Sequence, residues 1–396
     1  MISSKSTAER ALATVLLAVV GIILVAGLWP FRFFPANNVA WMQNRNGLEF
    51  GRNSVVLSRA RLDLAGPRWS SISIEIWLRP TGASLANRFL SIYTPENPNQ
   101  FSMVFYHNLF LTTRSKRDTK GGWVDTTIGV DDVVFPNASI FITITSGSRG
   151  SAMYFNGKLA RVFPGYLLSG RDLSGQLIFG TSPFEDHCWH GEWRGFAIYG
   201  EELPAADVLA HYQQWTEGHQ AELTKDSALT ALYDFHEGTG DTVHDLAGAA
   251  SDLFIPKSYS VPHKKILQLP WNEYRPDRSY VVDLAVNIAG FIPLGFLLSA
   301  FLWSTTRSRM PIFTAILIGA LISLTIELLQ AYIPERSSGM TDIITNTLGT
   351  ALGAILSGRQ KVRAGLAMLG LETKFQAPPA GHGSVDDDDK FRKDLC

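Results

Sequence analysis

The side chains that are the strongest candidates for binding or catalysis lie inside apolar stretches of the C-terminal third of the chain. An ionisable group inside a membrane span is costly, so each is a candidate for a binding or proton-transferring site. Helical spacing places residues that are four apart on one face. The candidates are Asp283 and Asn287 on the first stretch, Ser323, Glu327 and Gln330 on the second, Arg336 in the following loop, and Asp342 and Asn346 on the third. The alternative is that they cap helices at the membrane boundary, and Asp342 after Thr341 suits a helix start.

Long apolar runs must position these groups. The uncharged run from Ala11 to Leu28 is long enough to cross a hydrocarbon layer of about 30 Å. We expect a transmembrane helix at 11–29 rather than a signal peptide, because the run is long and lacks a convincing cleavage site. Three further helices within 283–358 complete a predicted four-helix transmembrane module. Their apolar cores are 284–303, 311–329 and 341–357, the last being the weakest because it holds four threonines, Asp342 and Asn346.

Basic residues between the predicted helices indicate the orientation. If four helices cross the membrane, three basic clusters fall on one side, and the positive-inside rule makes that side cytoplasmic. The clusters are Lys5 with Arg10, Arg307 with Arg309, and Arg359 with Lys361 and Arg363. We therefore expect a bacterial inner-membrane protein with cytoplasmic termini and the long second segment outside. The polar candidates then line a pocket of three helices towards the external leaflet, although Arg275 and Arg278 near that side count against this orientation.

The segment between the first two helices has the pattern of β-structure. Residues 71–78 alternate in polarity, with Ile72, Ile74 and Ile76 on one face. Similar short runs recur between turn sequences such as Asn156-Gly157. This pattern predicts an all-β sandwich or jelly roll at 36–256, followed by a linker at 257–282.

Several side chains of the predicted sandwich could bind a ligand. The candidates are Trp189 and Trp193 for a sugar, and Asp241, His244 and Asp245 for a metal, with calcium as the metal considered. For the tryptophans, burial in the core is the favoured alternative. For the metal candidates, the alternative is that they satisfy backbone donors in a turn. The run His187 to His190 resembles a zinc site, but neighbouring residues of a strand point to opposite faces.

Composition excludes several classes of protein. The chain has 396 residues, with 35 Lys and Arg against 36 Asp and Glu, whereas nucleic-acid-binding proteins usually carry a basic surplus. Two cysteines exclude a disulfide framework, and Cys188 is expected to be a lone buried thiol. No GxSxG elbow or distinctive pair of acids is present, so binding is favoured over catalysis. The tail at 371–396 is predicted to be disordered, and its DDDDK sequence matches an enteropeptidase site.

Parts of the β-segment resemble the LamG, concanavalin A-like superfamily. The similar stretches are NGLEFGRNSVVL (46–57), ISIEIWLRP (72–80), MYFNGKLAR (153–161) and LIFGTSPFEDHCWHGEWRGFAIYGEELPAADVLAHY (177–212). The resemblance implies a jelly roll that binds glycans or proteins, in some members with calcium. ALYDFHEGTGDTVHDLAG (231–248) resembles the motif that usually opens such domains. Because it stands at the end here, we predict a rearranged strand order in which 231–235 pairs beside an early strand.

The C-terminal apolar stretches resemble the VanZ-like membrane family. The similar stretches are NIAGFIPLGFLL (287–298), SLTIELLQAYIPER (323–336) and DIITNTLGTALGA (342–354). The resemblance implies a small multi-helix membrane protein, and some members are linked to glycopeptide-antibiotic resistance. The sandwich is then an insertion between the first two helices, and His263 is interpreted as a remnant of the family's usual polar stretch. The GxxxG at 349–353 indicates close helix packing.

Three functions are compatible with these patterns. We favour a cell-envelope binding protein, whose sandwich binds a glycan or a protein and whose membrane pocket holds a lipid headgroup or a lipid-linked saccharide. The basic residues that could attract a phosphate are Lys264, Lys265, Arg275 and Arg278. The second function is a membrane enzyme that uses Asp283, Glu327 and Asp342 on lipid-linked envelope glycans. The third is a scaffold that docks an envelope partner. Beyond calcium we expect no cofactor, and we expect no nucleic-acid partner.

Overall fold

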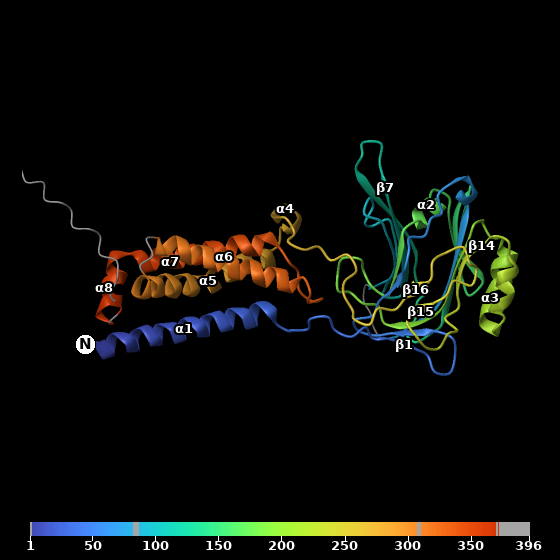
Figure 1. Cartoon of the computed structure of the whole chain (residues 1–396). Coiled ribbons are helices and arrows are strands. Elements are labelled where there is room, and N and C mark those ends of the chain that lie inside the picture. Colours follow the sequence, from blue (N-terminus) through green and yellow to red (C-terminus); the bar gives the residue numbers. More distant parts are fainter. Residues whose placement is uncertain (1, 82–86, 307–309, 370, 372–396) are drawn as a thin grey trace, which may run out of the picture. The chain divides into compact units, whose positions relative to one another are not determined.

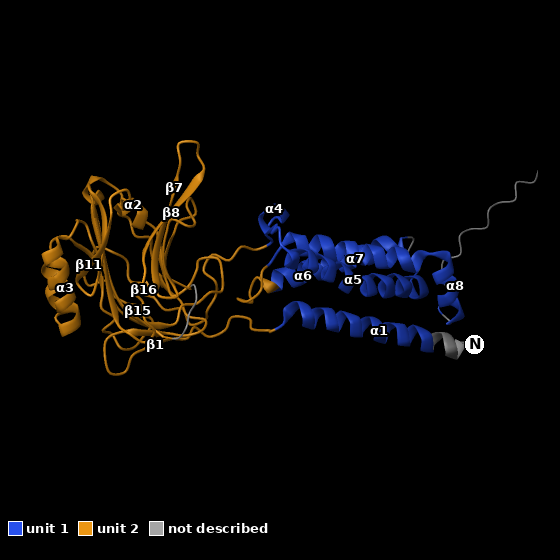
Figure 2. Cartoon of the chain, turned by 180° about the vertical axis from the view of Figure 1, so that it is seen from behind, with its two compact units in different colours: residues 1–29, 267–329, 338–396 blue, residues 30–266, 330–337 orange. Residues whose placement is uncertain are grey.

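The computed structural model describes residues 2–81, 87–306, 310–369 and 371. The chain forms two compact units, which Figure 2 colours differently. The helical unit comprises 1–29, 267–329 and 338–396, and the sandwich unit comprises 30–266 and 330–337. The short segment 330–337 therefore groups with the β-domain, although it connects two helices. Arg307, Arg309 and residues 372–396 of the predicted disordered tail, including Cys396, lie outside the described residues.

The described part of the helical unit contains four long and two short helices (Figure 1). They are α1 (Ile2–Leu28), α4 (Pro270–Glu273), α5 (Arg278–Thr305), α6 (Pro311–Gln330), α7 (Met340–Gly358) and α8 (Gln360–Met368). Within the described residues, three segments are long and apolar enough to cross a membrane: Thr7–Leu28, Arg278–Thr305 and Pro311–Gln330. The fourth predicted span forms α7 but is not among these three, so the four-span module is not confirmed. Its buried side carries Thr345, Asn346 and Thr350, which lower its mean hydropathy.

Glycines allow α5 and α7 to approach closely. A Cβ added to Gly349 would lie 2.2 Å from the carbonyl oxygen of Ile288, and one added to Gly353 would lie 2.0 Å from that of Ile292. Gly295 of α5 faces the α7 backbone at an equally short separation. Side chains at these positions would force the two backbones apart, so the predicted close packing of the GxxxG sequence is confirmed.

The described residues of the sandwich unit form two eight-stranded antiparallel sheets, which confirms the predicted all-β domain. The first sheet has the order β1 (Val39–Trp41), β2 (Leu48–Phe50), β13 (Gly191–Tyr199), β4 (Ile72–Pro80), β9 (Ile140–Gly147), β10 (Gly150–Phe155) and β11 (Lys158–Phe163), with β14 (Leu229–Tyr233) also paired to β13. The second has the order β15 (Thr242–Val243), β16 (Leu253–Phe254), β3 (Val56–Ser58), β12 (Gln176–Phe179), β5 (Asn87–Tyr93), β6 (Phe101–Tyr106), β7 (Leu109–Arg117) and β8 (Trp123–Val130). The connections between strands include three short helical segments, η1 (Pro67–Trp69), α2 (Gly170–Leu173) and η2 (Gln220–Lys225). A single apolar core fills the space between the sheets.

The strand order corrects one prediction. Residues 231–235 were expected beside an early strand, but β14 pairs with the late strand β13, Tyr233 lying opposite Phe196. The early strand β2 pairs with the beginning of β13, at Gly191 to Trp193. Only the second half of β13 is therefore free on that side, and β14 pairs there. The chain then crosses to the other sheet, where β16 pairs with the early strand β3.

The helix α3 (Ala205–Glu217) covers the outer face of the first sheet (Figure 1). Beneath it, the carboxylate of Glu75 is 0% exposed and accepts hydrogen bonds from Tyr199 Oη at 3.0 Å and Trp215 Nε1 at 2.9 Å. His211 Nδ1 lies 3.0 Å from the same carboxylate. Burial lowers the pKa of His211, but its hydrogen bond to Glu75 and the charges of Glu75 and Asp226 outweigh this effect, and the net shift is upward. This polar cluster joins α3 to the sheet.

Candidate functional sites

Two carboxylates from outside α7 accept hydrogen bonds from backbone N–H groups at its start. Glu327, near the end of α6, accepts a hydrogen bond at 2.8 Å from the N–H of Gly339, the residue that precedes α7. Glu273 of α4 accepts one at 3.0 Å from the N–H of Thr341. Free N–H groups and the positive end of the helix dipole both favour negative charge at this place. The two carboxylates therefore fasten α4 and α6 to the beginning of α7.

A second layer of polar contacts lies one turn further along α7. Asn287 of α5 donates from Nδ2 to Asp342 Oδ1 at 2.8 Å, and Asn346 donates from Nδ2 to Ser323 Oγ of α6 at 2.9 Å. Asn346 is 6% exposed, and its Oδ1 atom has no hydrogen-bond partner among the described residues. Five of the eight predicted pocket residues, namely Asn287, Ser323, Glu327, Asp342 and Asn346, are thus gathered by three helices.

The other three predicted pocket residues are placed differently. Asp283 is exposed on α5 and does not take part in these contacts. Gln330 and Arg336 group with the sandwich unit. Sequence reasoning missed Glu273, for which the sequence pattern offered no signal. In the structure a Cβ at Gly339 would collide with the Glu273 carboxylate.

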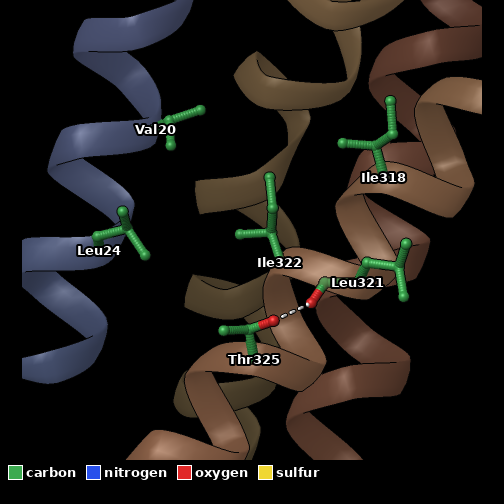
Figure 3. Close-up of a pocket in the computed structure, with 6 residues that line it drawn as sticks. All are labelled: Val20, Leu24, Ile318, Leu321, Ile322 and Thr325. Atoms are coloured by element: carbon green, nitrogen blue, oxygen red, sulfur yellow. Dashed lines mark hydrogen bonds between the residues drawn. The ribbon is translucent and has the colours of Figure 1, made fainter.

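An apolar groove of about 220 Å³ lies between α1 and α6 (Figure 3). Its lining residues are Val20, Leu24, Ile318, Leu321, Ile322 and Thr325. The Thr325 hydroxyl donates to the Leu321 carbonyl of its own helix at 2.8 Å. The groove therefore presents hydrocarbon to whatever contacts it.

Lys264 belongs to the sandwich unit and does not serve as a free phosphate ligand. Its Nζ donates to the carbonyl oxygens of Gln330 at 2.9 Å and Ile333 at 2.5 Å. Burial lowers the pKa of Lys264 to about 8, an effect opposed by the charges of Asp186 and Glu335. The lysine thus neutralises the carbonyl end of a helix, and its predicted role in attracting phosphate is wrong.

Segment 330–337 is firmly attached to the rest of the sandwich unit. Ile333 is 0% exposed, and the backbone N–H of Phe34 donates to the Tyr332 carbonyl at 3.5 Å. Glu335 lies 3.5 Å from Arg32 and 3.4 Å from Arg52. Apolar burial and charge pairing therefore act together on this short segment.

His263 also has a structural role within the sandwich unit. Its Nε2 lies 2.8 Å from Gln176 Oε1, and its ring stacks on Tyr93 with centroids 3.5 Å apart. Burial lowers the pKa of His263, and the charge of Arg61 adds to this effect. These contacts account for the histidine without any role in a membrane site.

The predicted sugar platform is wrong. Trp189 is 1% exposed and Trp193 is 0% exposed, and their rings pack against each other in the core. Phe179 adds an edge contact to Trp193 at a centroid distance of 4.9 Å. A sugar needs an accessible ring face, which neither tryptophan offers, so the favoured core alternative is confirmed.

The predicted metal site is not formed either. Both carboxylate oxygens of Asp245 accept backbone N–H bonds, from Leu232 and Ala247 on one side and from Ala250 on the other. His244 instead lies 3.2 Å from Glu237. Among the described residues no group of three or more His, Cys, Asp or Glu side chains could hold a metal ion. Asp241, His244 and Asp245 are therefore turn residues. The thiol of Cys188, which packs with Ile178 and Tyr259, is buried, and burial raises its pKa.

The outer face of the second sheet carries polar side chains on β6, β7 and β8, of which those on β8 are the exposed ones and Ser102 of β6 is buried. Phe110 of β7 points into the core, so Thr113, three residues further along the strand, points outwards. Thr113 pairs with Ser102 on one side and with Thr127 on the other, and the two threonine hydroxyls are 2.8 Å apart. At the end of the same hairpin Trp123 is 45% exposed and lies beside Arg117. Sequence reasoning missed this surface, which we call the β6–β8 face.

Comparisons with protein families match two parts of the chain. The family described as VanZ/LLP1 matches residues 235–359, and the concanavalin A-like lectin/glucanases superfamily matches residues 50–209. The chain joins a VanZ-like region to a concanavalin A-like domain. Three described helices are apolar and long enough to span a bilayer, and together with the VanZ-like region they indicate a membrane protein. No curated protein matches the chain.

Several solved structures resemble the chain at low identity. The receptor-binding domain of botulinum neurotoxin C/D mosaic serotype has 14% identity and a TM-score of 0.34, with 45% of each chain covered. The receptor-binding domain of botulinum neurotoxin type G has 17% identity and a TM-score of 0.34, again with 45% of each chain covered. The chain thus spans about half the length of the solved structures that it matches.

Proposed function

We propose that this VanZ-like protein is a binding protein of the bacterial cell envelope. In this proposal α1, α5, α6 and α7 cross the inner membrane, both termini are cytoplasmic, and the sandwich lies outside, where it binds a glycan or a protein. The polar cluster at the start of α7 holds the headgroup of a lipid or of a lipid-linked saccharide. The basic residues at the start of α1 and after α7 fall on the same side of the membrane in this arrangement, as the positive-inside rule expects of a cytoplasmic side.

The observation that carries the proposal is the exposed β8 side of the β6–β8 face. The outer face of the first sheet is covered by α3, whereas this half of the second sheet presents hydroxyl groups, an arginine and an exposed indole. Hydroxyl and charged side chains can hydrogen-bond a polar ligand, and an aromatic ring can stack on the apolar face of a sugar. The likeness of the domain to a lectin superfamily agrees with a glycan as the ligand.

The buried side of α7 supports its assignment as a fourth span. Its polar residues face other helices, while Ile344, Leu348 and Ile355 are 54%, 46% and 51% exposed. A helix with an apolar outer face and a polar, hydrogen-bonded inner face suits a membrane bundle.

The polar cluster favours binding over catalysis. Glu273 and Glu327 already accept backbone N–H bonds, so their charge serves to hold α7. The unpartnered Oδ1 of Asn346 is a buried acceptor and would suit a hydroxyl or amine donor of a headgroup.

Binding of glycans by the full-length protein in detergent tests the proposal. We expect the wild-type chain to bind a subset of envelope glycans on an array. We expect Trp123→Ala to weaken that binding about 5- to 150-fold, since stacking on one aromatic side chain contributes about 1–3 kcal/mol. Phe135→Ala is the matched control, because Phe135 is 56% exposed but lies in a loop outside the β6–β8 face. Equal binding by the wild type and the Trp123 variant would refute the proposed face.

A further inference from the structure

The segment between the sandwich and α5 is held rigidly against the start of α7. The N–H of Gln268 donates to the Ser338 carbonyl at 3.0 Å, and the N–H of Met340 donates to the Gln268 carbonyl at 2.8 Å. Gln268 therefore pairs with this stretch as a short parallel bridge around Gly339. Five residues later, the bond from Thr341 to Glu273 fastens α4 at the same place.

Two aromatic side chains of the segment between Gln268 and α5 are largely exposed. Trp271 is 72% exposed and Tyr274 is 65% exposed, and Tyr274 makes an edge contact with Tyr280 of α5. Trp and Tyr are typical of the lipid headgroup region, and α5 is a candidate span that begins at Arg278.

Two arginines complete this surface, and the one carboxylate between them, Asp277, interacts with the charge of Arg275. Arg275 and Arg278 are exposed, and neither forms an ion pair with a carboxylate of the described residues. The intervening Asp277 accepts the N–H of Tyr280 at 2.8 Å as the cap of α5, and this bond lowers its pKa. In the proposed orientation both arginines stand at the external end of α5, where the positive-inside rule disfavours basic residues.

We propose that Trp271, Tyr274, Arg275 and Arg278 form a docking site for the phosphate group of anionic phospholipids. The aromatic rings lie at headgroup depth, and the two guanidinium groups bind the phosphate by charge and hydrogen bonds. This site deepens the proposed function, since it rests on the membrane placement of α5, and it assigns headgroup charge recognition to this segment rather than to Lys264.

Native mass spectrometry of the full-length chain tests the site. The chain is incorporated into vesicles of equal parts phosphatidylcholine and phosphatidylglycerol, extracted in mild detergent, and its bound lipids are counted. We expect enrichment of phosphatidylglycerol in the wild type and a roughly 30-fold weaker preference in the double variant Arg275→Gln/Arg278→Gln, from the usual contribution of two basic residues near a membrane surface. The control Arg45→Gln/Arg149→Gln removes the same charge from exposed positions of the sandwich unit and is expected to keep the preference.

Two outcomes would overturn the inference. One is an unchanged preference in the Arg275/Arg278 variant, and the other is an equal loss in the control, which would mean that net charge alone attracts the lipid. A Trp271→Ala variant is expected to retain less of both lipids while preserving their ratio, and an altered ratio would also contradict the assigned roles. Glycan binding by the β6–β8 face is measured separately, so failure of the lipid site is distinguishable from failure of the sandwich proposal.

Discussion

Replacement of Glu75 by leucine should weaken the sandwich unit severely. Glu75 is 0% exposed beneath α3, and its carboxylate is shared by Tyr199, Trp215 and His211 at 3.0, 2.9 and 3.0 Å. Leucine has a similar volume but accepts no hydrogen bond. The variant therefore leaves three polar groups buried without their acceptor, one of them a histidine whose positive charge the carboxylate stabilises.

The size of the effect follows from these contacts. Removing one partner of a buried, hydrogen-bonded charge pair costs about 3–5 kcal/mol. For a domain of this size, each kcal/mol lowers the melting temperature by about 2–4 °C. We therefore expect the unfolding transition of the sandwich unit to fall by roughly 6–20 °C in Glu75→Leu.

Thermal unfolding of the full-length protein in detergent, followed by tryptophan fluorescence, measures this change. The control is Glu49→Leu, because Glu49 is an exposed residue of the neighbouring part of the same sheet. An exposed substitution of this kind should change stability by no more than about 0.5 kcal/mol. If both variants melt at the wild-type temperature, or if both fall equally, the Glu75 cluster does not hold α3 on the sheet.

Two further predictions concern helix packing and pH. Gly353→Ala should destabilise the helical unit by about 1–3 kcal/mol, because the added Cβ would lie 2.0 Å from the α5 backbone. Gly290→Ala, with open space around it, should not destabilise the unit. Thermal unfolding followed by far-UV circular dichroism compares the two variants, and equal melting temperatures would contradict the close packing. Because the pKa of His211 is raised in the folded chain, its stabilising protonated form is fully present below the unfolded pKa and is lost as the pH rises through the folded one. The sandwich should accordingly melt at a lower temperature as the pH rises above neutrality, and His211→Gln should flatten that dependence; a wild-type profile with the same slope as the variant would rule out His211 as its source.

Much of the architecture was predictable because it depends on local periodicity. Apolar runs predicted the helices, and alternation with turn residues predicted the sandwich. Glu75 shows the limit: within 71–78 it stands on the polar side of an alternating strand, a pattern typical of an exposed residue. It is buried because α3, more than a hundred residues later, covers that face.

The candidate sites were less predictable for a similar reason. The spacing of polar residues along three helices predicted the region that contains Asn287, Ser323 and Asp342. Glu273 lies on the separate short helix α4, and its contact with the start of α7 could not be predicted from sequence spacing. Trp189 and Trp193 have the composition of a sugar platform and of a core equally well, and only the packing of two sheets distinguishes these roles.

The placement of segment 330–337 determines when the sandwich can be completed during synthesis. Residues 267–329, which contain α5 and α6, are translated between the two parts of the sandwich unit. At a translation rate of about 5–20 residues per second, the last part follows roughly 3–13 seconds after the rest. Until then Lys264 lacks its carbonyl partners, and Arg32 and Arg52 lack Glu335. Completion of the sandwich therefore depends on prior synthesis of the α5–α6 helix pair.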